Sequence, residues 1–200
     1  MIGESYSKSL NIFNDAKDFC YNGLNYNTYY VRHIAKKLKT TPSNLFLFSI
    51  LCIPHDYSGY RVQGADHGLA EFITDMSQLE NTITFLFADH GNTYTGYAGT
   101  LDGRHEQYNP HFFTIIPGNV VEKIGKSSMD ALRKNRLRMV TLIDLHHTVK
   151  HLANTSYHNK GLLTEVPANR TCSTVELSAP TYCICKGWLE PLLRALCYDN

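Results

Sequence analysis

The sequence has no long apolar run, no excess of charge of one sign and no apolar segment at its start. Its longest apolar run, residues 45–54, is well short of the roughly 18 residues that a membrane-spanning helix needs, so no membrane segment is expected. Nineteen basic and 18 acidic side chains give a net charge of +1, which argues against nucleic acid as a partner. The polar opening MIGESYSKSL lacks the hydrophobic region of a secretory signal peptide.

Cysteines are few, but four of the six crowd into the last 30 residues: Cys172, Cys183, Cys185 and Cys197. Asn154 and Asn169 each begin a glycosylation sequon. Together they predict disulfides and an extracellular or lumenal compartment, with reduced cytosolic thiols, chance sequons or a zinc site as the alternatives. A secreted character without a signal predicts that the chain begins inside a longer protein. Cys52, within the apolar run, is expected to be buried.

Two kinds of apolar pattern alternate along the chain. Short continuous runs predict buried strands at residues 45–53, 82–88 and 112–116. Helical spacing predicts helices at residues 27–39, 62–79, 120–135 and 143–153. Residues 91–109 are rich in Gly, Thr and Tyr and are expected to form a loop. This order predicts an α/β fold with a mostly parallel sheet and helices on both faces.

Two predicted strands end in residue types that bind metals. Asp89 and His90 follow one strand directly, and His55 and Asp56 follow another. Ligands gather at the carboxyl ends of strands in open α/β sheets, and carboxylates and imidazoles are zinc ligands. The sequence therefore suggests one shared metal site, with Asp89 as a turn former and Asp56 as a helix cap as the competing interpretations.

A helix near the C-terminus carries a further metal-binding spacing. His147 and His151 are four residues apart, so one helix face could present both to a metal. The Glu of a His-Glu-x-x-His motif is absent, and His146 and Asp144 beside them look like ordinary helix residues. We therefore favour a structural role for this pair.

Several stretches resemble one superfamily. NTITFLFADHG resembles the strand and metal motif of the alkaline phosphatase and sulfatase superfamily, and PHDYSGYRVQGADHGLAEFITDMSQLENT resembles the stretch before it. GTLDGRHEQYNPHFFTIIPG and TLIDLHHTVKHLA resemble the segments that follow. The cysteine-bearing NRTCSTVELSAPTYCICKGW is similar to the end of an uncharacterised animal branch called domain of unknown function 229. The resemblance runs from about residue 18 to residue 188.

The resemblance implies the C-terminal part of an alkaline-phosphatase-like domain at residues 18–165, after a leading segment at 1–17 and before a cysteine-rich tail at 166–200. It implies a metal-dependent hydrolase of phosphate or sulfate esters that uses Zn or Ca. Asp89 and His90 carry over as ligands, Asp56 as a ligand of the other metal position, and His55 as a ligand or as the group that orients Asp56. The family's nucleophile precedes this sequence, so the chain alone is expected to be inactive. A non-enzymatic extracellular binding protein and an incomplete gene model are the alternatives.

Overall fold

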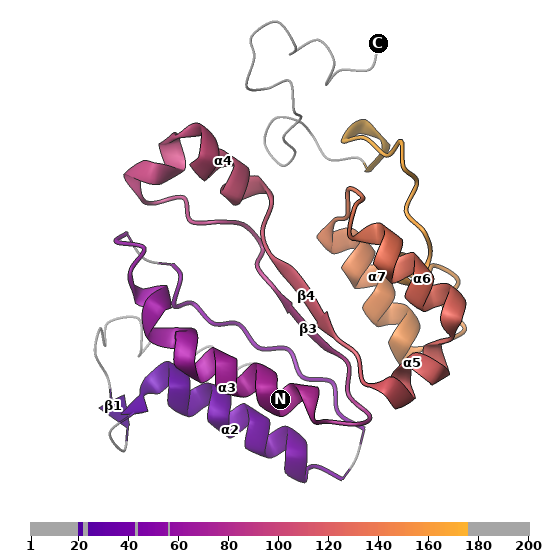
Figure 1. The fold of residues 1–200 in the computed structure, drawn as a ribbon, viewed down its shortest axis with the longest axis horizontal. Helices are drawn as coiled ribbons and strands as arrows, with labels where there is room; N and C mark the ends of the chain where they lie inside the picture. The colour runs from indigo at the N-terminus through magenta and orange to yellow at the C-terminus, as the bar shows by residue number, and fades with distance from the viewer. Residues whose placement is uncertain (1–19, 22–23, 43, 56, 176–200) are drawn as a thin grey trace, which may run out of the picture. The chain divides into compact units, whose positions relative to one another are not determined.

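The computed structural model describes residues 20–21, 24–42, 44–55 and 57–175. The chain divides into two compact units, Met1–Leu79 and Glu80–Asn200, which are described separately. The described residues combine α-helices with two pairs of short antiparallel strands, so the α/β class expected from the sequence is confirmed (Figure 1). None of the described helices has the length and apolar character needed to cross a membrane.

Two helices of the first unit pack side by side (Figure 1). β1 (Cys20–Tyr21) pairs with β2 (Leu24–Asn25), and α2 (Tyr26–Thr40) follows. A 3₁₀ turn, η1 (Arg61–Ala65), leads into α3 (Asp66–Ser77). Val31, Ile34 and Ala35 of α2 and Met76 of α3 are buried. The helix predicted at 27–39 is confirmed, and the one predicted at 62–79 is present as η1 followed by α3.

The prediction of a strand at residues 45–53 is wrong. No strand is assigned there, and Phe46 and Phe48 are 72% and 62% exposed. A strand exists only where its backbone pairs with a neighbour, and none of the other described residues pairs with this segment. The expected burial of Cys52 is wrong for the same reason: its side chain is exposed and its thiol is free.

The second unit begins with a strand pair. β3 (Thr84–Phe87) pairs with β4 (Phe112–Ile115), with Thr84 opposite Ile115 and Phe87 opposite Phe112. The strands predicted at 82–88 and 112–116 are thus confirmed, but their predicted burial is wrong, because their side chains are at most half-buried and Phe113 is 59% exposed. Their pairing is antiparallel, whereas a mostly parallel sheet was expected, because the residues between the strands return the chain alongside β3. The bond from the Ala88 N–H to the His111 carbonyl, 3.2 Å, extends the ladder past Phe87.

The long loop predicted at residues 91–109 is wrong, because this segment is largely helical. It contains the 3₁₀ turn η2 (Gly96–Gly99) and α4 (Leu101–Tyr108). The Thr100 side chain caps α4 by accepting a hydrogen bond from the Gly103 N–H at 3.1 Å. The helix has too few apolar residues to show a helical period, so its cap and its packing hold it.

The described part of the second unit contains three further helices: α5 (Gly118–Ile124), α6 (Lys126–Asn135) and α7 (Leu142–Ala153) (Figure 1). A single helix was predicted at 120–135, but it is broken at Gly125. The φ of Gly125 is 83°, a backbone conformation that glycine adopts readily and other residues disfavour. The helix predicted at 143–153 is confirmed. Two further 3₁₀ turns follow, η3 (Gly161–Leu163) and η4 (Ser173–Val175). Val120, Ala131, Leu145, Leu162, Leu163 and Val166 are buried.

Two buried polar side chains fix η3 against α6 and α7. The Asn135 amide donates to the Leu162 and Thr164 carbonyls at 3.0 and 2.9 Å and accepts from the Val166 N–H at 2.8 Å. The Thr148 hydroxyl accepts from the Leu162 N–H at 2.8 Å. Because these side chains satisfy backbone groups of an irregular segment, they allow it to be buried.

Candidate metal site at the end of strand β3

The sequence Asp89-His90-Gly91 forms a bend immediately after β3, and its two polar side chains face solvent. The Asp89 and His90 side chains are 80% and 51% exposed. The His90 N–H donates to Asp89 Oδ1 at 3.0 Å, and His90 Nδ1 lies 2.6 Å from the Gly91 carbonyl oxygen. Since a carbonyl can only accept, Nδ1 carries the proton of this bond. In neutral His90 the Nε2 lone pair is therefore free.

This arrangement brings two acceptor atoms together. His90 Nε2 lies 3.7 Å from Asp89 Oδ2. Two ligands that each lie about 2.0–2.2 Å from a tetrahedrally coordinated zinc ion are themselves roughly 3.4 Å apart. The carboxylate and the imidazole are thus close to the separation at which one ion can bind both.

Gly91 fixes the bend against the C-terminal end of α4. Its N–H donates to the Gln107 carbonyl at 3.0 Å. A Cβ at this position would lie 2.5 Å from the Glu106 carbonyl oxygen and 2.8 Å from Gln107 Cα, so a side chain here would force the backbones apart. The glycine after Asp89 and His90 is therefore required by close packing of two backbones.

The support under this bend was not anticipated from spacing. Gly103 in α4 packs against the backbone of Tyr97 and Ala98 in η2, where a Cβ would clash. The Tyr97 hydroxyl donates to Glu106 Oε1 at 3.1 Å, and this bond to a carboxylate raises the pKa of Tyr97. The stretch GTLDGRHEQYNPHFFTIIPG contains a Gly-x-x-Glu sequence, Gly103 to Glu106. This was the one feature of the sequence that pointed to the packing of α4 on η2, because Gly103 and Glu106 both contact η2.

The structure does not place the other two proposed ligands, His55 and Asp56, beside Asp89 and His90. His55 belongs to the first unit, where it is exposed and its N–H donates to the Cys52 carbonyl at 3.2 Å. Asp56 lies outside the described residues. Within the part of the chain that the structure describes, no three His, Cys, Asp or Glu side chains gather as a metal site. A site shared by all four residues stays a prediction.

The tail cysteines and the sequons are only partly described. Cys172 is buried and disulfide-bonded. Cys183, Cys185 and Cys197 lie outside the described residues. Asn154 and Asn169 are both exposed, as glycan attachment requires.

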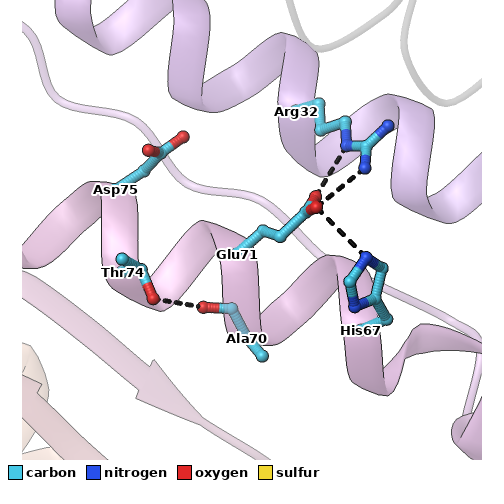
Figure 2. A pocket seen from close by; sticks show the side chains of 6 residues that line it. All are labelled: Arg32, His67, Ala70, Glu71, Thr74 and Asp75. Carbon is cyan, nitrogen blue, oxygen red and sulfur yellow. Dashed lines mark hydrogen bonds and ion pairs between the residues drawn. The ribbon is translucent and has the colours of Figure 1, made fainter.

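A shallow pocket on the first unit lies between α2 and α3 and is lined by charged side chains (Figure 2). Arg32 donates to Glu71 through Nε at 2.7 Å and Nη2 at 2.8 Å, and His67 Nε2 lies 3.2 Å from the same carboxylate. The hydrogen bonds from Arg32 lower the pKa of Glu71. Asp75 pairs with Lys39 at 2.6 Å. These charges pair with one another, so the pocket offers no free group for a ligand.

Asp144 has a larger role than its sequence context suggested. Its carboxylate binds both terminal nitrogens of Arg170, at 2.7 and 2.9 Å, and also accepts from the Thr141 N–H at 2.8 Å. Burial alone would raise the pKa of Asp144, but the bonds from Arg170 and Thr141 outweigh it and lower that pKa. The residue is therefore a buried helix cap and ion-pair partner.

Comparison with known families gives one match. The family model described as "Protein of unknown function (DUF229)" matches residues 3–192. No curated protein and no solved structure matches the chain. Because the family model covers nearly the whole sequence, the chain belongs to the family of proteins of unknown function DUF229.

Proposed function

We propose that Asp89 and His90 supply part of a divalent-cation site in a metal-dependent hydrolase domain that acts on phosphate or sulfate esters. The observation that carries this proposal is the 3.7 Å separation of Asp89 Oδ2 and His90 Nε2 on an exposed bend. Gly91 supports the proposal further, because it holds the bend in place through α4. Zn and Ca are the candidate ions.

The chemistry of such a site follows from the ligand types. A bound divalent cation polarises an ester oxygen and offsets the negative charge that develops there. Asp89 and His90 would hold the ion and leave positions open to substrate, because both side chains face solvent.

The first test is hydrolysis. We expect the 200-residue chain, supplied with Zn²⁺, Mn²⁺ or Ca²⁺, to cleave neither aryl sulfates nor phosphate mono- and diesters above background. The physical reason is that no nucleophile is assigned in this sequence, and a cation that only positions and polarises the ester supplies no covalent step. Asp89→Ala is the matched control. Metal-dependent turnover that disappears in Asp89→Ala would contradict the proposed inactivity and would show that a metal-bound water or an unassigned residue attacks the ester.

A secretory location belongs to the same proposal. The disulfide at Cys172 and the exposure of Asn154 and Asn169 support it. We expect the four tail cysteines to resist alkylation without reductant when the chain is made in a secretory host, since each bridge that closes a loop stabilises by roughly 2–4 kcal/mol. Mass spectrometry of the alkylated chain measures this, with Cys52 as the internal control that should react. Free alkylation of all four tail thiols would refute an oxidising compartment.

A further inference from the structure

A histidine pair on α7, separate from the Asp89–His90 bend, is held by one tyrosine. His147 and His151 are one helical turn apart and half-buried. The chain turns back after α7, where the Tyr157 N–H donates to the Asn154 carbonyl at 2.9 Å. Tyr157 then contacts both imidazoles. Its hydroxyl lies 2.7 Å from His147 Nδ1, and its carbonyl oxygen lies 2.7 Å from His151 Nδ1.

The contact to His151 determines which of its ring nitrogens stays available, and the contact to His147 permits the same assignment. The Tyr157 carbonyl can only accept a hydrogen bond, so His151 Nδ1 carries a proton and neutral His151 keeps a lone pair on Nε2. The Tyr157 hydroxyl can accept from His147 Nδ1 in the same way. Neither Nε2 atom has a hydrogen-bond partner among the described residues.

Tyr157 also restrains the ring of His147. The two rings are nearly parallel, with planes 17° apart and centroids 5.9 Å apart. The Lys150 ammonium lies 4.5 Å from the centroid of the Tyr157 ring, so this neighbouring positive charge rests on the tyrosine. A hydrogen bond on the second ring nitrogen and a restrained ring plane are what surrounding residues give to metal-binding histidines.

We infer that His147 and His151, oriented by Tyr157, form a two-histidine site for one divalent transition-metal ion through their Nε2 atoms. The spacing of four residues puts the two side chains about 5–6 Å apart at Cβ on one helix face. Imidazole ligands select Zn²⁺, Cu²⁺ and Ni²⁺ over Ca²⁺ and Mg²⁺. The described residues provide no third ligand, so water fills the other positions and the affinity is below that of a closed four-ligand zinc site.

Zinc titration of the full chain, followed by imidazole ¹⁵N NMR, tests this site residue by residue. Before zinc is added, His151 should show the tautomer with its proton on Nδ1. Zinc should then shift His147 Nε2 and His151 Nε2 together. Tyr157→Phe, which removes the hydroxyl and keeps the ring, should weaken the affinity by about tenfold or more, and His151→Gln should weaken it further. His158→Gln is the control, because its ring also contacts Tyr157 but belongs to no ligand pair.

Two results would overturn the inference. One is a proton on Nε2 of His151 in the metal-free chain, which needs no variant to fold. The other is a zinc affinity at these histidines that is absent, or unchanged by His151→Gln. Resonances of His90 report the Asp89–His90 bend in the same spectra, so failure at one site is distinguishable from failure at the other.

Discussion

Replacing Asp144 with alanine should lower the free energy of unfolding by about 3–5 kcal/mol, the usual cost of removing one partner of a buried ion pair. The Asp144 and Arg170 side chains are only 9% and 20% exposed, so the variant leaves the guanidinium in a poorly hydrated place. It also removes the carboxylate that caps α7 through the Thr141 N–H. Denaturant unfolding of both chains measures the difference.

The matched control is Glu165→Ala. Glu165 pairs with Lys134 at 2.6 Å, but both side chains are about half exposed, at 45% and 58%. Water screens such a pair, so its loss should cost about 1 kcal/mol or less. Equal losses for Asp144→Ala and Glu165→Ala would show that the Arg170 pair is not a buried contact that stabilises the second unit.

The same pair predicts a dependence on pH. The pKa of Asp144 is lower in the folded chain than in the unfolded chain, so the folded state holds this carboxylate ionised. Its contribution to stability is complete above the unfolded pKa, near 4 for aspartate, and is lost as the pH falls through the folded pKa. The stability gap between the wild type and Asp144→Asn should therefore narrow below about pH 4.

Gly161→Ala should lower the free energy of unfolding by roughly 2–6 kcal/mol, the sum of backbone strain and overpacking. Gly161 has a φ of 54°, a backbone angle that residues with a side chain disfavour. A Cβ there would also clash with the Asp144 carbonyl oxygen and lie 2.5 Å from both the backbone N and the hydroxyl of Thr148. These are the groups that join η3 to α7, so the clash falls in the packed part of the second unit.

Two other glycines separate the causes of this effect. Gly125 has a φ of 83° with nothing within 4 Å of an added Cβ, so Gly125→Ala isolates strain, at about 1–3 kcal/mol. Gly96 has open space, and Gly96→Ala should change little. Thermal unfolding should rank the losses in the order Gly161, Gly125, Gly96. A loss at Gly161 no larger than at Gly125 would refute the close approach of η3 to α7.

Sequence patterns predicted the elements whose apolar residues are buried against a neighbour. The stripes of α2, α3 and α7 belong to such elements, whereas the runs around β3 and β4 are only partly buried and are held by their pairing with one another. Residues 45–53 have the same apolar character but pair with no described strand, because composition does not determine whether a partner strand is present. For α4 the sequence pattern failed in the opposite sense, because it predicted a loop where a helix forms. A cap and close glycine contacts stabilise this helix, and it has no apolar stripe.

The candidate site shows the same limit. The sequence correctly indicated that Asp89, His90 and Gly91 follow a strand, and close backbone packing explains the glycine. Distances between side chains could not be derived from the spacing of residues in the sequence. The 3.7 Å separation of the Asp89 and His90 side chains and the contacts of Tyr157 with two histidines were therefore not predicted. The structural role of Asp144 was not predicted, because its ion-pair partner, Arg170, is 26 residues away in the chain.

The most direct test of the account is whether Asp89 and His90 bind one ion together. We would titrate the chain with Zn²⁺ and follow His90 by imidazole ¹⁵N NMR, in the wild type, Asp89→Ala, His90→Ala and the double variant. Total zinc uptake is measured in parallel, with His147 and His151 of α7 replaced. If the two residues share one ion, zinc shifts His90 Nε2, Asp89→Ala abolishes this shift, and the double variant loses no more uptake than either single variant, because both ligands hold the same ion. Zinc shifts at His90 that are unchanged by Asp89→Ala, or additive losses of uptake, would contradict a shared site.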